Sequence, residues 1–501
     1  MKNIRQVTIV GGGMAGWMTA AALARFLDGT GTEIQLFEPG ASDAVGVGEG
    51  TIPAIHDFNA KLDIDEQELM RATDATFKLG VEFVDWMQKG HAYMHPFGRY
   101  GLDMNGIAFH HYWRRLREAG DTSDISAYSL ATAAAKQGRF SHPTSDANSI
   151  YASYSYAYHL DAGLYARFLR RYCERRGVTR TLGRIVDVTL DPESGNIGGL
   201  QLADGRTIGG DLFVDCSDFR GLLIGETLGT DYEDWSRWFP CDRAVIVPSE
   251  KTDDPDPYTR VTARDAGWQW RIPLQRLTGN GHVYSSQYVS DEEAVATLLA
   301  NAEGEPGGDP NFLRFTTGKR VQTWKRNCVA IGSSGGFLEP LESTSTWLIQ
   351  AAIIELTKWF PTRDFHEADI DAFNRAVDKR FEEVRDFLIA HYCCAGRDDT
   401  DFWRARQSMP IPDSLQHRID VFRASGHVVL DPSNLFDEDN WLSVLIGQGV
   451  LPSSWHPRTD SFDDGAVDQR LGYMRSMVEE AAAAMPSHGE TLNRYREAED
   501  A

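Results

Sequence analysis

The 501-residue chain has no apolar run long enough to span a bilayer and no C-x-x-C motif. Its six cysteines include one adjacent pair, Cys393 and Cys394, whose spacing is unsuited to clamping a metal ion. We therefore predict no membrane span and no metal site, and we expect reduced thiols in a cytoplasmic protein. A predicted strand begins at Val7, so we expect no signal peptide before the fold.

Positive charge is also scarce. The chain has 50 lysine and arginine residues against 73 aspartate and glutamate residues, which gives a formal net charge of −23 at pH 7. Such acidity argues against a nucleic-acid groove and against binding to an anionic membrane. A hydrophobic content of 42% is typical of a globular protein. A chain of this length has room for roughly two to four domain-sized units.

The N-terminal stretch is the most informative part of the chain. A β-branched run at residues 7–10 predicts a buried parallel strand, and the alanine-rich run that follows the next turn predicts a helix. In that turn Gly11, Gly13 and Gly16 fit the G-x-G-x-x-G pattern, and Ala15 lies among them. Because amides at the start of a helix bind phosphate, this unit predicts a dinucleotide site.

Two features after this unit fit the same ligand. A second predicted strand, Glu33 to Phe37, ends in Glu38, whose carboxylate suits the ribose hydroxyls of an adenosine. Residues 45–53, VGVGEGTIP, then place Gly48 and Glu49 in a glycine-rich segment before a predicted helix. A surface loop is one interpretation of this segment, but its position directly after the nucleotide unit favours a strap over the cofactor.

The next two segments carry candidate site residues. Thr76 to Trp86 alternates apolar and polar residues, which predicts a strand with Lys78 on its polar face. Composition alone favours a solvated lysine. His91 to Gly98 is predicted to be a turn-rich loop that could line an aromatic pocket. A metal site is disfavoured there because no third ligand keeps a regular spacing nearby.

The remaining pattern is α/β up to about residue 365. Ala157 to Glu174 is predicted to be an amphipathic helix, and Asp211 to Cys216 a strand whose end could touch the dinucleotide again. Residues 1–365 are thus predicted to form an α/β core, with substrate-site segments interleaved at about 77–150 and 235–320. Residues 366–501 read as mostly helical and are predicted to cap the substrate pocket.

Two tryptophans form an unusual short run within this core. Residues 267–273, GWQWRIP, place Trp268 and Trp270 two residues apart on a predicted strand, so both indoles point to the same face. Residue chemistry alone favours a core position. The alternative is a wall between a cofactor and a substrate.

A further strand, loop and helix follow. The predicted strand Cys328 to Gly332 leads into small residues and a helix that begins near Thr344, an arrangement that suits polar or anionic cofactor groups. Glu342 lies just ahead of this helix. A carboxylate that caps the helix and a carboxylate with a chemical role are both compatible with that position.

The run GWQWRIP resembles the G-W-x-W-x-I-P signature of the flavin-dependent halogenases of the tryptophan halogenase family. The order of the segments GGGMAG, GVGEGTIP, TFKLG, HPFG, DCSDFRG and GFLEPLESTS is also similar to that family, and the resemblance covers nearly the whole chain. It implies an α/β, FAD-binding, Rossmann-like fold of the flavin monooxygenase type with a mostly helical C-terminal cap. The implied activity is FADH2-dependent halogenation of an electron-rich aromatic, with dioxygen and chloride or bromide.

The resemblance also implies roles for single residues. Hypohalous acid made at the flavin would pass to Lys78, acting as a haloamine or as a hydrogen-bond donor, with Glu342 and Ser343 as the other catalytic residues. Thr344 and Ser345 match the halide site. The predicted cofactor contacts are Gly11, Gly13, Ala15, Gly16, Glu38, Gly48, Glu49, Trp268, Trp270, Gly332 and Leu341. The predicted substrate contacts are His95, Pro96, Phe97 and Trp455.

The chain departs from the family pattern in places that concern the halide and the substrate. Ser345 stands where the family often has glycine, and Asp218 stands where glycine is usual. The paired tyrosines that bind an amino-acid head group are not evident between Trp441 and Pro457. We therefore expect indole or an indole derivative as substrate, with tryptophan turned over poorly.

Two other functions stay open at this stage. A flavin-dependent aromatic hydroxylase would need neither Lys78 nor the tryptophan pair, and a flavin-binding protein without turnover would need neither Lys78 nor Glu342. No NAD(P)H site is evident, so a separate NAD(P)H flavin reductase is expected to supply FADH2. The expected partners are this reductase and a small aromatic substrate, without nucleic acid or membrane; a homodimer is compatible with the sequence.

Overall fold

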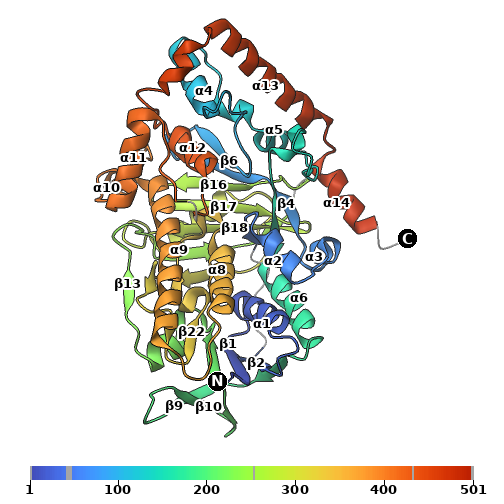
Figure 1. Cartoon of the computed structure of the whole chain (residues 1–501), viewed down its shortest axis with the longest axis vertical. Helices are drawn as coiled ribbons and strands as arrows, with labels where there is room; N and C mark the ends of the chain where they lie inside the picture. The colour runs from blue at the N-terminus through green and yellow to red at the C-terminus, as the bar shows by residue number, and fades with distance from the viewer. Residues whose placement is uncertain (1–2, 41–47, 252–253, 432–433, 498–501) are drawn as a thin grey trace.

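The computed structural model describes residues 3–40, 48–251, 254–431 and 434–497. The N-terminal strand β1 lies within a six-stranded sheet of order β21–β22–β12–β1–β2–β8, of which Figure 1 labels β1, β2 and β22. β1 (Gln6–Val10) pairs in parallel with β2 (Glu33–Glu38) and with β12 (Leu212–Asp215). The predicted strands around the glycine turn are confirmed. The other strands of this sheet are β8 (Thr179–Leu182), β21 (Trp324–Lys325) and β22 (Cys328–Ala330).

Helices cover this sheet. α1 (Met14–Phe26) follows β1 directly and packs against α6 (Ala162–Glu174) and α8 (Ser345–Lys358). Its small residues, including Gly16, Ala20 and Ala21, are buried, which lets the helix lie close to the strands. The short helices near this unit are α2 (Ile55–Lys61) and α3 (Glu66–Ala72). Two small antiparallel sheets extend the core. One contains β9 (Ile185–Leu190), β10 (Ile197–Leu202) and β11 (Thr207–Ile208), and the other contains β13 (Tyr232–Asp234), β20 (Gly318–Arg320) and β23 (Gly336–Phe337).

A second, larger sheet has the order β19–β14–β18–β17–β16–β5–β6. The tryptophan-bearing strand β17 (Gly267–Pro273) lies between β16 (Thr259–Arg264) and β18 (Leu277–Tyr284) and pairs antiparallel with both. Its central position buries both tryptophans. The remaining elements of this layer are β5 (Gly80–Val84), β6 (Ala92–Pro96), β14 (Arg243–Ile246), β15 (Ser249–Glu250), β19 (Asn311–Arg314) and α7 (Asp291–Ala300).

A small three-stranded sheet brings two predicted site segments together. β7 (Ala157–Asp161) pairs on one side with β3 (Gly48–Gly50) and on the other with β4 (Thr76–Lys78). β3 also contacts β17 and β18 of the large sheet. The end of β4, where Lys78 lies, is therefore fixed close to the described part of the predicted strap.

The structure corrects three predicted elements. The strand predicted from Thr76 to Trp86 divides at Leu79, whose N–H binds the Pro257 carbonyl and whose carbonyl accepts from Phe97. The predicted loop His91 to Gly98 contains β6, which pairs antiparallel with β5. The predicted helix from Ala157 begins only after Asp161, because residues 157–161 pair as β7 and the Asp161 side chain caps α6.

The chain beyond residue 365 is mostly helical, as predicted. α9 (Glu367–Cys393) packs against α8 and β21 and continues towards the large sheet, where it contacts α12 (Glu438–Gly447) (Figure 1). The division into domains at residue 365 stays a prediction. No helix of the described ranges is both long and apolar enough to cross a membrane. The other helices are α4 (Phe109–Glu118), α5 (Leu130–Lys136), α10 (Asp401–Gln407), α11 (Asp413–Ser425), α13 (Asp464–Ala484) and α14 (His488–Glu497).

Candidate active site

A cavity of about 870 Å³ opens at the carboxyl ends of β1, β2, β12 and β22. Ligands of parallel α/β sheets bind at this edge. Most of the predicted cofactor contacts line the cavity, and a few stand outside its lining. The lining includes Gly11, Gly13, Ala15, Glu38, Gly48, Glu49, Trp270, Gly332, Ser343 and Ser345; Gly16, Trp268, Leu341 and Thr344 are not part of it.

The glycine turn fits a bound pyrophosphate. Gly11 has a φ of +124°, and a Cβ there would lie 2.0 Å from the Cys216 carbonyl oxygen, so the turn requires glycine. A Cβ on Gly16 would lie 1.9 Å from the Gly11 carbonyl oxygen. A Cβ on Gly13 would meet no atom within 4 Å and would enter the cavity at the start of α1. The turn thus leaves space for a ligand where the helix amides are unpaired.

Glu38 lies at the end of β2, as predicted, and is buried. Its carboxylate forms an ion pair with Arg180 of β8, and both side chains line the cavity. The acid is therefore held in one orientation at the edge of the sheet. This placement fits the acceptor that the ribose of FAD needs, with Arg180 as a neighbouring cation.

The described part of the strap lies against the cavity. Gly48 and Glu49 of β3 line it, whereas residues 45–47 of the predicted strap lie outside the described residues. Burial raises the pKa of Glu49 to about 7, against the opposing effect of the Lys78 charge. The Glu49 carboxyl is thus coupled electrostatically to Lys78.

The two tryptophans of β17 occupy different positions around the cavity. Their ring centroids are 5.9 Å apart, and Trp270 lines the cavity, where Gly281 leaves room for its ring. The Trp268 Nε1–H donates to Glu339 Oε2 over 2.9 Å. The pair is therefore buried in the core, and one member of it is also a wall of the cofactor cavity.

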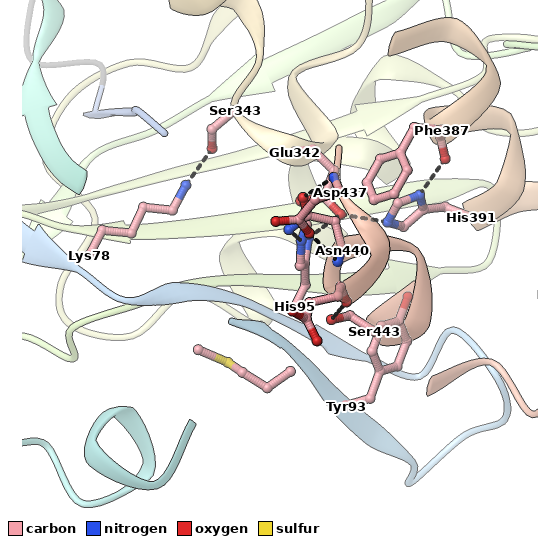
Figure 2. A network of polar contacts seen from close by, with 12 residues as sticks. Lys78, Tyr93, His95, Glu342, Ser343, Phe387, His391, Asp437, Asn440 and Ser443 are labelled. Atoms are coloured by element: carbon pink, nitrogen blue, oxygen red, sulfur yellow. Dashed lines mark hydrogen bonds and ion pairs between the residues drawn. The ribbon is translucent and has the colours of Figure 1, made fainter. Parts of the chain in front are cut away.

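Lys78 is fully buried, which corrects the solvated position that composition favours. Its ammonium donates to Ser343 Oγ over 2.8 Å (Figure 2). It also donates to the Thr51 carbonyl over 3.1 Å. Burial lowers the pKa of Lys78 to about 7, although the nearby carboxylates of Glu342 and Glu49 oppose this effect. A lysine with a pKa near neutrality can give or take a proton at physiological pH.

Ser343 connects the cavity with Lys78. It lines the cavity, adopts a left-handed φ of +59° and presents its hydroxyl to the ammonium. Gly50 of β3 lies directly beside this contact, since a Cβ there would be 2.5 Å from Ser343 Oγ and 3.1 Å from Lys78 Nζ. The hydroxyl and the bare backbone of Gly50 thus lie at the junction between the cavity and the lysine.

Glu342 does not cap α8. Its carboxylate is buried and accepts from His95 Nδ1 at 2.9 Å and from His391 Nε2 at 2.7 Å (Figure 2). Burial acts to raise the pKa of Glu342, but the two histidines outweigh it and lower the pKa to about 2. The structure therefore shows a buried carboxylate held ionised by histidines from two different elements.

The start of α8 carries the predicted halide residues. Thr344 is the N-cap residue of α8, its side chain makes no capping hydrogen bond, and its buried Oγ1 has no partner among the described residues. Ser345 lines the cavity. An unpartnered buried hydroxyl at the positive end of a helix fits an anion that binds next to the cofactor.

The predicted substrate residues are only partly brought together. His95 binds Glu342, and the Phe97 ring lies 5.2 Å from Lys78 Nζ. Pro96 is buried on β6, opposite Gly80 of β5. Trp455 instead donates to Asp460 over 2.7 Å, and no contact within the described part of the chain joins it to Lys78 or Glu342.

Two residues of this site are missing from the prediction. His391 lies near the end of α9, and Asn440 lies in the first turn of α12, 3.0 Å from His95 Nε2. The one sequence signal for His391 is a histidine inside the apolar run FLIAHY, which is also typical of a core position. Asn440 carries no signal beyond its place in a helix cap.

The glycine turn and its cavity fit an FAD-dependent α/β enzyme, in which the buried Lys78 is bonded to Ser343 of the cavity lining. The profile of the tryptophan halogenase family matches residues 6–464, and the chain belongs to this family. Tryptophan 6-halogenase SttH of Streptomyces toxytricini is 35% identical, with 98% of each chain covered.

Solved structures agree with this membership. BrvH, a flavin-dependent halogenase from Brevundimonas sp. BAL3, is 46% identical with a TM-score of 0.95, covering 98% of this chain and 99% of that one. Xcc4156, a flavin-dependent halogenase from Xanthomonas campestris, has the same identity and TM-score and covers 99% of both chains. The predicted family, fold, cofactor and activity class are confirmed: the protein is a flavin-dependent halogenase that uses FADH2 and a halide. Enzymes of this class use an aromatic substrate and a separate flavin reductase.

Proposed function

We propose that this halogenase chlorinates or brominates indole or an indole derivative, with Lys78 delivering the electrophile and Glu342 stabilising the cationic ring. The observation that carries the proposal is the buried Lys78 ammonium, bonded to a serine that lines the cofactor cavity. Among the described residues its hydrogen-bond partners are a hydroxyl and a carbonyl, neither of which is charged. Burying an ionisable amine there costs free energy that a purely structural role would not require.

The residues divide the reaction between two places. When bound, reduced FAD supplies with dioxygen and a halide the hypohalous acid that the reaction consumes. Gly11, Gly13 and Glu38 would hold its nucleotide portion, while Thr344 and Ser345 would hold the halide at the start of α8. Ser343 then offers its hydroxyl at the junction. Lys78 binds the oxidant through its N–H groups or, as the deprotonated amine, forms an N–halogen bond while the oxygen–halogen bond of hypohalous acid breaks and water leaves.

Glu342 acts on the other side of the ring. Electrophilic substitution places positive charge on the ring, and a fixed carboxylate in a buried site lowers the barrier to that charge. The carboxylate stays ionised because two histidine N–H groups bind it. Figure 2 shows Lys78 and Glu342 reaching the site from separate elements, which supports a ring bound between them.

The preference for indole over tryptophan rests on the C-terminal region. Residues 441–457 contain no tyrosine that could bind an amino-acid head group, and Trp441 packs edge-on against Phe387 in the core. The 46% identity to BrvH and Xcc4156 also exceeds the 35% identity to SttH, whose name specifies tryptophan. A cytoplasmic location is part of the same proposal and is supported by six free cysteines; a homodimer stays a prediction.

A screen of arenes against halides tests this function. Purified protein, FAD and an NAD(P)H flavin reductase are mixed with chloride or bromide and with indole, substituted indoles, tryptophan or phenols, and products are identified by their isotope pattern. We expect halogenated indoles, with a kcat/KM for indole at least about tenfold above that for tryptophan, about 1.4 kcal/mol in transition-state binding. A kcat/KM for tryptophan well above that for indole would refute the proposed substrate preference. A hydroxylated product that forms without halide would refute halogenation as the reaction.

A further inference from the structure

The hydrogen bonds around Glu342 begin at a group that can only accept. His391 Nδ1 lies 2.9 Å from the Phe387 carbonyl oxygen, one helical turn earlier in α9. A carbonyl has no proton to donate, so the His391 Nδ1 must carry one. The other ring nitrogen, Nε2, lies 2.7 Å from Glu342 Oε1.

The network ends at a group that can only donate. The backbone N–H of Asp437 donates to Asn440 Oδ1 over 2.9 Å in the capping box of α12, which fixes the orientation of the Asn440 amide. The amide nitrogen of Asn440 therefore faces His95 Nε2 at 3.0 Å and donates to it. His95 Nε2 must be unprotonated, so His95 is neutral and its Nδ1–H donates to Glu342.

The Phe387 carbonyl fixes a proton on His391 Nδ1, and the Asn440 amide fixes the tautomer of His95. One proton is then left to place, the one between His391 Nε2 and Glu342 Oε1. We propose that His391 is a doubly protonated imidazolium ion and a positioning residue, which keeps Glu342 ionised and aimed at the substrate ring while neutral His95 contributes only a hydrogen bond. The opposite placement, a neutral His391 beside a protonated Glu342, would remove the negative charge that the cationic ring needs. The inference rests on the proposed role of Glu342.

Burial makes this pairing necessary. Glu342 and the side chain of His391 are at most 1% exposed, and an isolated carboxylate at such a site would take up a proton. Lys78 from β4 is coupled electrostatically to Glu342, but no hydrogen bond between them exists among the described residues, because its ammonium binds Ser343 and Thr51. His391 is thus the one cation in hydrogen-bond contact with Glu342 in the described structure.

Other titratable groups face this network, and none replaces His391. Tyr93 of β6 is coupled to Glu342, but burial raises its pKa well above 10, so it stays neutral. Asp437 at the start of α12 binds the Asn440 backbone, and Asp439 binds the Tyr100 N–H. Burial raises the pKa of Asp439 to about 7. Lys78 and Asp439 titrate in the parent and in any His391 variant, so a comparison between the two isolates the effect of His391.

A measurement without turnover tests the protonation state. The protein is labelled with 15N in histidine, and the His391 signals are assigned by their loss in His391→Gln. We expect both His391 ring nitrogens to be protonated at neutral pH and His95 to show one protonated and one unprotonated nitrogen. A His391 signal with an unprotonated Nε2 would overturn the proposal, whatever substrate the enzyme accepts.

Two variants test the role. His391→Phe removes the N–H donor and the charge, whereas His391→Gln keeps an N–H donor without the charge. We expect halogenation by His391→Phe to fall at least about tenfold at neutral pH and the variant-to-parent ratio to fall further as the pH is lowered, because an unsupported Glu342 takes up a proton. His391→Gln should lie between the parent and His391→Phe, and oxidation of reduced FAD should be unchanged in both.

His282→Phe is the matched control, since His282 is another buried histidine and its Nδ1 forms a hydrogen bond with a carbonyl, that of Ala294. It should leave the pH dependence of halogenation as in the parent. A ratio for His391→Phe that does not change with pH would show that His391 is only a packing residue. If the parent halogenates no arene, the 15N measurement still decides the protonation state.

Discussion

Replacing Gly50 with alanine perturbs the junction between the cofactor cavity and Lys78 by a single methyl group. The added Cβ would lie 2.5 Å from Ser343 Oγ and 3.1 Å from Lys78 Nζ, and both distances are shorter than van der Waals contact. Gly50 has no positive φ, so its backbone accepts alanine without strain. The Ser343 hydroxyl must therefore move away, and its 2.8 Å bond to the ammonium must break or lengthen.

The size of the effect follows from the bond that is lost. A hydrogen bond to a charged group contributes about 1.5–3 kcal/mol. If the bond positions Lys78 for the oxidant, its loss should lower the halogenation rate by about 10- to 100-fold, since 1.4 kcal/mol corresponds to a factor of ten. Overpacking should also cost about 1–3 kcal/mol of unfolding free energy.

The assay measures oxidation of reduced FAD and halogenated product in the same reaction. Gly50→Ala should oxidise reduced FAD as the parent does but form much less halogenated product, so that the yield of product per reduced FAD falls. Gly472→Ala on α13 is the matched control, because the nearest atom to its Cβ is 3.9 Å away, and it should behave as the parent does.

A double variant gives the decisive comparison. Ser343→Ala removes the hydroxyl that the new methyl group displaces, so adding Gly50→Ala to it should cause a smaller loss than Gly50→Ala causes in the parent, with only the 3.1 Å contact to Lys78 Nζ remaining. Fully additive losses, or a Gly50→Ala enzyme with parental product yield, would refute the assignment of Ser343 and Gly50 to the junction.

Three further changes test separate parts of the site. Glu38→Arg places a second cation beside Arg180 and should weaken FAD binding at least about tenfold; an unchanged FAD affinity would overturn the cofactor assignment. Lys78→Met should raise the unfolding free energy at pH 7 by several kcal/mol, because burial lowers the Lys78 pKa from 10.5 to about 7 and a tenfold change in proton affinity corresponds to about 1.4 kcal/mol. This increase should shrink towards pH 10.5. The unfolded lysine keeps its proton up to its usual pKa of 10.5, whereas the folded lysine loses it above about 7. The parent therefore becomes more stable as the pH rises from 7 to 10.5, and its difference from Lys78→Met becomes smaller. A difference in unfolding free energy that does not change with pH would contradict the lowered pKa of Lys78. Thr344→Val removes an unpartnered buried hydroxyl and should raise the KM for halide roughly threefold or more without loss of stability; an unchanged KM would exclude this hydroxyl from the halide site.

The sequence predicts the nucleotide unit well because its determinants are local. A β-branched strand, three glycines and an alanine-rich helix follow one another within a few turns, and each glycine has a steric reason that the structure bears out at Gly11 and Gly16. The acid at Glu38 follows from the end of the next strand. Local order along the chain is sufficient for these assignments.

The errors of prediction arise where pairing with distant strands decides the structure. The segment from Ala157 has a helical composition, but its first five residues pair with both β3 and β4. The predicted loop at His91 becomes a strand because β5 offers it an edge. Tertiary pairing overrides local propensity in both cases.

The environment of the candidate site depends on long-range contacts even more. Composition favours a solvated Lys78, yet its partners lie 27 and 265 residues away in the chain. Glu342 is 49 residues from His391 and 247 from His95, so no local pattern connects them. The family resemblance points to Lys78 and Glu342, but burial, tautomers and the role of His391 require the fold.

The most direct measurement is single-turnover halogenation by Lys78→Ala, with reduced FAD oxidation followed in the same sample. The glycine turn and Glu38 that would hold the cofactor are unchanged, so we expect FAD binding and oxidation within about twofold of the parent. The halogenated arene should fall by roughly a thousandfold or more, the scale for removing a catalytic group. If Lys78→Ala halogenates within about tenfold of the parent, a barrier change of only about 1.4 kcal/mol, then free hypohalous acid carries the reaction and the central role of the buried lysine is wrong.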